Sequence, residues 1–174
     1  MTEYRFTGVL ERAADDHERL LGLFIRLLDV DDAIVRRQLV ASVAREIERH
    51  AAAEHATLYA ALRELPGAGD LLDDAAAEHD EIAEALDDLI ATPTDDPTWT
   101  EMLAALRACV ERHIETEEGE VFTIAEELLG GDKLIELGDA FARHGQARAG
   151  SAAFTGQSYM LPLLPRIGVT FLRL

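Results

Sequence analysis

Two copies of one histidine and glutamate pattern run through this chain and constrain how it folds. In the first half, His17 is followed by His50-Ala-Ala-Ala-Glu54, and in the second half His79 is followed by His113-Ile-Glu-Thr-Glu117. The two histidines are 50 − 17 = 33 residues apart in the first copy and 113 − 79 = 34 apart in the second. Residues four apart lie on one face of an α-helix, so each His-x-x-x-Glu pair points an imidazole and a carboxylate the same way. The repeat therefore predicts two similar helical hairpins that bring these side chains together.

Apolar residues recur at three- and four-residue steps through four long segments, as in amphipathic helices. Short breaks that contain Pro, Gly or Asp separate the segments, and Asp32 and Asp96 are placed to cap the helices that follow them. We expect helices at about residues 10–28, 33–65, 70–91 and 97–129. Long amphipathic helices with short connections favour an all-α fold, an up-down-up-down antiparallel four-helix bundle.

The chain changes character after Gly131. We predict that residues 1–131 form the bundle domain and that residues 132–174 form a separate C-terminal region. This region is expected to hold a short fifth helix, from Asp132 to about His144, and a hydrophobic C-terminal tail. Residues 145–174 contain no acidic side chain. Three interpretations of the tail stay open, which are docking on the bundle, self-association with another chain, and loose order.

The composition excludes several classes of partner. The chain has 16 Lys and Arg against 34 Asp and Glu, and its formal charge of −18 repels nucleic acid and anionic membrane surfaces. We find no apolar run long enough to span a bilayer and no secretory signal. The single cysteine, Cys109, cannot form an internal disulfide. We therefore expect a cytoplasmic protein that binds neither nucleic acid nor membrane.

The repeated side chains suit a pair of metal ions. The candidate ligands are His17, His50, Glu54, His79, His113 and Glu117. Imidazole and carboxylate groups together suit iron, manganese or zinc, and the lack of a cysteine cluster argues against iron–sulfur and structural zinc sites. We assign one metal to the first two histidines and the other metal to the last two, with both glutamates shared. Burying two glutamates in a bundle core without a cation or partner would cost several kcal/mol, which favours a metal over a purely structural role.

Several neighbours of these ligands have more than one interpretation. His55 directly follows a glutamate ligand, and we expect it either to contact a ligand or to face solvent. Glu46, four residues before a ligand histidine, is an extra ligand, an acceptor for a ligand, or a salt-bridge partner. Cys109 occupies the matching place in the second copy and is interpreted as a small core residue, with a redox-active thiol as the alternative. Tyr59 and Phe122 are interpreted as packing residues.

The two-part motif resembles that of the hemerythrin-like, or HHE cation-binding, domain family, over about residues 10–130. The resemblance implies a four-helix bundle around a non-haem di-iron centre, with two iron ions joined by an oxo or hydroxo bridge. In oxygen-carrying hemerythrins the third helix bears His-x-x-x-His, but here the residue four after His79 is Ala83. This departure argues against reversible oxygen carriage. The chain resembles more closely the actinobacterial and mycobacterial hemerythrin-like proteins, for which peroxide breakdown and responses to nitric oxide are implied.

We therefore predict a di-iron protein that disproportionates hydrogen peroxide to oxygen and water and that also reacts with nitric oxide. The alternative is a module that binds or senses oxygen, nitric oxide or iron supply. A third interpretation is an iron donor for the repair of metal centres. These alternatives differ in whether the protein is an enzyme, and the sequence does not choose among them.

Overall fold

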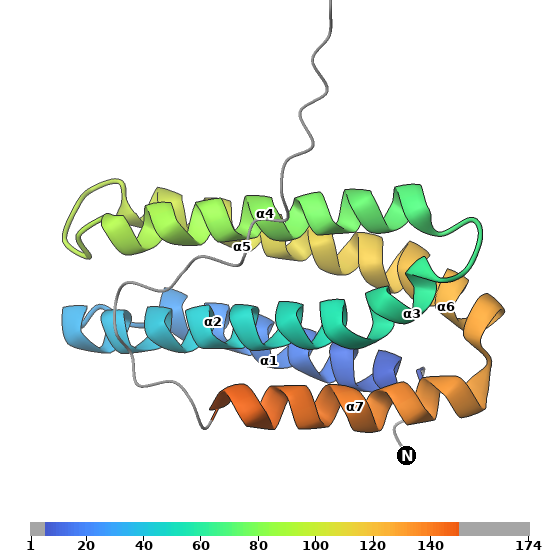
Figure 1. Ribbon diagram of the computed structural model, residues 1–174. Helices are drawn as coiled ribbons and strands as arrows, with labels where there is room; N and C mark the ends of the chain where they lie inside the picture. Colours follow the sequence, from blue (N-terminus) through green and yellow to red (C-terminus); the bar gives the residue numbers. More distant parts are fainter. Residues whose placement is uncertain (1–5, 150–174) are drawn as a thin grey trace, which may run out of the picture.

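The structure is a computed structural model that describes residues 6–149 of the chain, with side chains through residue 145. All regular secondary structure within this range is helical (Figure 1). Among the described residues, no helix has the length and hydrophobicity needed to cross a membrane. Residues 150–174, which hold most of the predicted hydrophobic tail with its proposed role in self-association, lie outside the described residues.

Four helical arms run side by side in alternating directions (Figure 1). In chain order the arms are α1 (Val9–Leu28); α2 (Ala33–Glu54) with η1 (His55–Tyr59) and α3 (Ala60–Arg63); α4 (Gly69–Ala91); and α5 (Trp99–Thr116) with η2 (Glu117–Val121) and α6 (Phe122–Leu129). Helix α1 packs on α2, and α4 packs on α5, so the bundle consists of two hairpins. The predicted all-α, up-down-up-down bundle is confirmed.

Helix α2 begins where the sequence predicts, because Asp32 caps it. The Asp32 Oδ1 atom accepts hydrogen bonds from the backbone N–H groups of Ile34 and Val35, both at 2.9 Å. Asp96 instead closes a turn, accepting from the Thr98 N–H at 2.8 Å, and helix α5 starts only at Trp99. The fourth helix therefore starts slightly later than the predicted residue 97.

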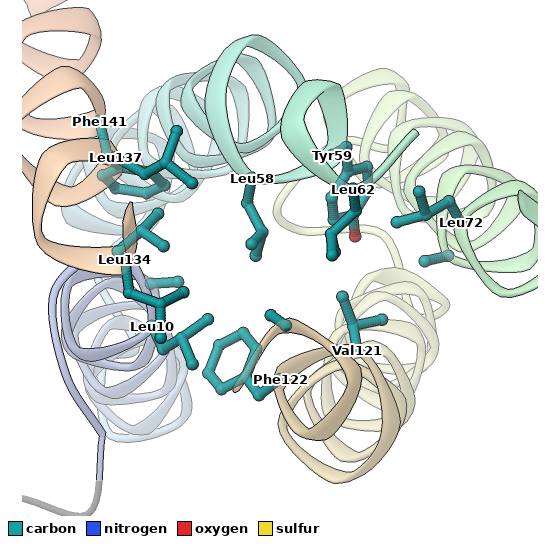
Figure 2. Close-up of a cluster of buried hydrophobic side chains, with 14 of the residues drawn as sticks. Leu10, Leu58, Tyr59, Leu62, Leu72, Val121, Phe122, Leu134, Leu137 and Phe141 are labelled. Atoms are coloured by element: carbon teal, nitrogen blue, oxygen red, sulfur yellow. The ribbon is translucent and has the colours of Figure 1, made fainter. Parts of the chain in front are cut away.

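A fifth helix, α7 (Gly131–Ala149), lies along α1 and α2 (Figure 1). It extends beyond the predicted end near His144. The close approach to the start of α1 requires Gly138, because a Cβ atom there would lie 2.7 Å from the backbone carbonyl carbon of Gly8. Three side chains of α7 join the bundle's buried core, namely Leu134, Leu137 and Phe141 (Figure 2). The fifth helix is thus longer than predicted and shares a core with the bundle.

The core has two apolar clusters separated by a polar layer. The first cluster contains Leu10, Leu58, Leu72 and Phe122, and Figure 2 shows these side chains converging from different arms. The second contains residues such as Leu20, Phe24, Ile82 and Val110. On each arm a histidine lies between the two clusters in the sequence. These flanking pairs are Ala13 and Leu20, Ile47 and Ala53, Ala75 and Ile82, and Val110 and Val121.

Candidate metal centre

The six predicted ligands meet in this polar layer. His17 comes from α1, His50 from α2, His79 from α4 and His113 from α5, while Glu54 ends α2 and Glu117 begins η2. None of these residues is more than 4% exposed. Two groups, each of three histidines and one glutamate, have ligand atoms within 4.8 Å of one another. The bundle therefore collects all six residues, far apart in sequence, at one buried point.

The histidine Nε2 atoms form two close pairs, one in each hairpin. The Nε2 atoms of His17 and His50 are 3.2 Å apart, and those of His79 and His113 are 3.1 Å apart. Two unprotonated ring nitrogens at this distance point lone pairs at each other. A proton or a cation between them removes this repulsion, so each pair of histidines is suited to bind one metal ion.

The two glutamates connect the histidine pairs. The Glu54 Oε2 atom lies 3.2 Å from the His50 Nε2 atom and 3.5 Å from the His79 Nε2 atom. The Glu117 Oε2 atom lies 3.2 Å from the His17 Nε2 atom and 3.5 Å from the His113 Nε2 atom. Each carboxylate thus reaches one histidine of each pair, which is the placement of a shared ligand. The geometry agrees with the predicted grouping, and metal binding by these residues stays a prediction.

The glutamates lack the partners that buried carboxylates normally have. All four of their oxygen atoms are buried and without a hydrogen bond. Burial, together with the charge of Glu117, raises the pKa of Glu54 to about 7. Burial also lowers the pKa of His113 to about 4 and that of His79 well below its usual value. Neutral imidazoles such as these two, beside unpartnered carboxylates, are a donor set that a divalent cation would satisfy.

A carboxylate or an imidazole lies near the outer nitrogen, Nδ1, of each ligand histidine, and it is within hydrogen-bond distance for all of them except His50. The partner atoms and their distances from Nδ1 are Glu118 Oε1 at 3.0 Å for His17, Asp16 Oδ2 at 3.6 Å for His50, His55 Nε2 at 3.2 Å for His79, and Glu78 Oε2 at 3.3 Å for His113. Such partners fix a ring so that its Nε2 atom faces the metal. His55 therefore contacts a ligand, which is one of its two predicted roles.

Three of these outer partners were not singled out from the sequence. Asp16 and Glu78 each directly precede the first histidine of a copy, and Glu118 directly follows a glutamate ligand. This regular placement was a usable signal, since an acidic residue next to a ligand in both copies suggests a shared role. The signal was obscured because 34 acidic residues make such neighbours common.

Glu46 is a salt-bridge partner, which was one of its predicted roles. Its Oε1 atom accepts hydrogen bonds from Arg19 Nε at 3.0 Å and from Arg49 Nη2 at 2.6 Å. Both arginines also contact Asp16, and the Arg49 Nη2 atom lies 2.7 Å from Asp16 Oδ2. Glu46 thus acts on the site only through the arginines that hold Asp16. Cys109 is partly buried against the second apolar cluster, in keeping with a core role.

Two aromatic residues pack on ligand rings. Phe122 stacks on His17 with ring centroids 6.3 Å apart and planes 10° apart. Tyr59 stacks on His79 at 5.9 Å and 21°. Both residues therefore pack, as predicted, but Tyr59 also carries a buried hydroxyl group without a hydrogen-bond partner. Burial and the charges of Glu117 and Glu54 raise the Tyr59 pKa, so its hydroxyl stays protonated and available as a donor.

A π-helical turn occurs at the glutamate ligand of each hairpin. Turn η1 begins directly after Glu54, and turn η2 begins at Glu117. Such wide turns are rare and are found mostly at functional sites. The sequence predicts uninterrupted helices here, because one wide turn leaves no mark on apolar spacing. Its occurrence within one residue of the glutamate ligand in both hairpins indicates that the turn belongs to the site.

Comparison with known proteins supports the same interpretation. The sequence profile described as the Hemerythrin HHE cation binding domain matches residues 9–125. The fold is similar to the crystal structure of a hemerythrin HHE cation binding domain-containing protein from Mycobacterium kansasii, with a TM-score of 0.76 and 24% sequence identity. That alignment covers 84% of this chain and 90% of the other. No curated protein sequence matches the chain.

Proposed function

This chain belongs to the hemerythrin HHE cation-binding domain family, and from that premise we propose that it holds two iron ions and disproportionates hydrogen peroxide. The supporting observation is the buried donor set, in which four histidine Nε2 atoms surround two carboxylates whose oxygens have no hydrogen bond. Imidazole and carboxylate together are a common ligand set for redox-active iron. The sequence resemblance to hemerythrin-like proteins supports iron over manganese and zinc.

The chain's own residues would bind and enclose the metals. His17 and His50 would hold one ion, His79 and His113 would hold the other, and both glutamates would bind both ions. A pair of irons supplies the electron exchange by which two molecules of peroxide become one of oxygen and two of water. With two imidazoles and two shared carboxylates as its protein ligands, each ion would still be able to bind water or peroxide. The apolar clusters on both sides of the layer would limit entry to small molecules.

The test is metal analysis followed by oxygen measurement. The full chain is loaded with ferrous iron, the iron per chain is measured by elemental mass spectrometry, and oxygen release from peroxide is followed with an electrode. We expect close to two irons per chain and sustained oxygen release. Glu117→Gln should lower both quantities, because it removes a shared ligand. Glu120→Gln is the matched control, since this exposed glutamate lies in the same π-helical turn.

The alternative functions give different results in the same experiment. Two bound irons without oxygen release would refute peroxide disproportionation. If nitric oxide or oxygen then changed the visible spectrum, a binding or sensing role would be supported. If the irons passed readily to a metal-free acceptor protein, an iron-donor role would be supported. Absence of bound metal would refute all of these proposals.

A further inference from the structure

The four outer partners of the ligand histidines follow the internal repeat of the chain. Asp16 and Glu78 are equivalent, because each precedes the first histidine of its copy and faces the second histidine of the same hairpin. His55 and Glu118 are also equivalent, because each follows a glutamate ligand and faces the first histidine of the other hairpin. Three of the four partners are carboxylates. His55 alone departs from the pattern.

The matched pair of carboxylates places the same kind of charge beside each metal position. Asp16 lies near His50, and its Oδ2 atom is 2.7 Å from Arg49. Glu78 lies near His113, and its Oε1 atom is 3.9 Å from Arg112. Each carboxylate thus lies beside one ligand histidine and contacts an arginine, although at 3.6 Å the Asp16 Oδ2 atom is beyond hydrogen-bond distance of the His50 Nδ1 atom. The difference in charge between the positions comes from the other matched pair.

That other pair differs in charge. The Glu118 carboxylate lies 3.0 Å from the His17 Nδ1 atom, and the His55 Nε2 atom lies 3.2 Å from the His79 Nδ1 atom. When the His79 Nε2 atom binds a metal, its Nδ1–H group donates a hydrogen bond to His55. A carboxylate acceptor makes a ligand imidazole a stronger electron donor than a neutral imidazole acceptor does, because the hydrogen bond is charge-assisted. His17 is therefore the stronger ligand of the two.

We propose that the two metal positions are inequivalent, that the position formed by His79 and His113 releases its ion first, and that His55 is the positioning residue responsible. The inference rests on the metal pair of the proposed function and not on its reaction with peroxide. Loss of an outer partner typically changes metal affinity by about 10- to 100-fold, so we expect a difference of at least about tenfold between the positions.

The experiment is a stepwise chelation of the full iron-loaded chain. Protein is dialysed against rising chelator concentrations, and the iron per chain is measured at each step by elemental mass spectrometry. The unaltered chain should lose iron in two steps with a plateau near one ion per chain. Anomalous diffraction from crystals at this plateau should place the retained iron beside His17 and His50.

The repeat supplies matched variants. His55→Glu gives the second position the carboxylate that the first one has, so its ion should be held more tightly and the two steps should merge at high chelator concentration. A residue with only a structural role would not improve retention when replaced. Glu118→His should weaken the first position and merge the steps at low chelator concentration. The double variant should restore two steps with the order of release reversed.

Each outcome has a defined meaning. Loss of both irons in one step from the unaltered chain would overturn the inference and leave the metal pair intact. Unchanged steps in His55→Glu would also overturn it, provided that circular dichroism shows a folded chain. If that variant does not fold, Glu118→His provides the test instead. Two separate release steps with a plateau near one iron per chain, as in the unaltered chain, would then overturn the inference. A chain that binds no iron would overturn both the inference and the proposed function.

Discussion

Replacing Glu54 by glutamine should stabilise the metal-free protein and destabilise the metal-loaded one. Glu54 is fully buried, and neither of its oxygens has a hydrogen bond. Burial and the nearby charge of Glu117 raise its pKa from 4.5 to about 7. Without metal, the ionised carboxylate therefore opposes folding. Glutamine has the same shape and no charge, so Glu54→Gln removes this cost and also removes a shared metal ligand.

The magnitude follows from the difference between the folded and unfolded pKa values. The folded pKa lies above the unfolded one, so the contribution of Glu54 is fully present below about pH 4.5 and is lost as the pH rises to about 7. Because a tenfold change in a proton-binding constant is equivalent to about 1.36 kcal/mol, the loss is about 1 kcal/mol at pH 5.5 and about 3 kcal/mol at pH 8. The metal-free variant should therefore exceed the unaltered chain in free energy of unfolding by about these amounts.

Urea denaturation of metal-free protein at pH 5.5 and pH 8 measures this difference. Adding iron should reverse the order, because each ion that binds only the folded chain at 100 times its dissociation constant adds about 2.7 kcal/mol, and the two proposed ions together add about 5 kcal/mol. The exposed Glu120→Gln should show no pH-dependent change. The reasoning would be refuted if metal-free Glu54→Gln were less stable than the unaltered chain at pH 8, or if the difference were the same at both pH values.

Three further predictions concern packing, an outer partner and pH. Gly138→Ala should cost about 1–3 kcal/mol in urea denaturation, because its Cβ atom would press on the α1 backbone, whereas Gly22→Ala, where space is open, should stabilise by up to about 1 kcal/mol. Asp16→Asn should weaken iron binding about 10- to 100-fold in chelator competition, because the outer partner of His50 loses its charge. Iron uptake should weaken as the pH falls below about 7, because Glu54 then keeps the proton that a metal must displace, and calorimetry in buffers of different ionisation enthalpy should detect the released proton.

The arms of the bundle could be predicted because local and long-range signals agreed. Apolar spacing marked each helix, and side chains such as Asp32 marked where one begins. The extent of α7 could not be predicted in the same way. Its length depends on docking against α1 and α2, which needs a glycine at residue 138 facing Gly8 from a distant part of the chain. No pattern among neighbouring residues in the sequence indicates this close approach of α7 to α1.

The six candidate ligands could be predicted from the sequence, whereas most of the groups near the histidine Nδ1 atoms could not. The four histidines and two glutamates were found because two copies of one spacing recur. Of the outer partners, only His55 was singled out, because histidine is rare in this chain, whereas Glu78 and Glu118 were hidden among many acidic residues. The direction in which each Nδ1 atom points depends on the rotation of every helix, and the π-helical turns alter that rotation.

Two departures from the internal repeat act in the same direction. Helix α7 has no counterpart on the second hairpin among the described residues, and its Phe141 ring lies 6.3 Å from the ring of His50. It therefore covers the metal position of the first hairpin with an extra apolar layer. His55 weakens support for a ligand of the other position. If the centre holds two ions as proposed, the more tightly held one would lie beside α7 and the more loosely held one on the hairpin without it, so we expect exchange with external chelators to begin at the position formed by His79 and His113.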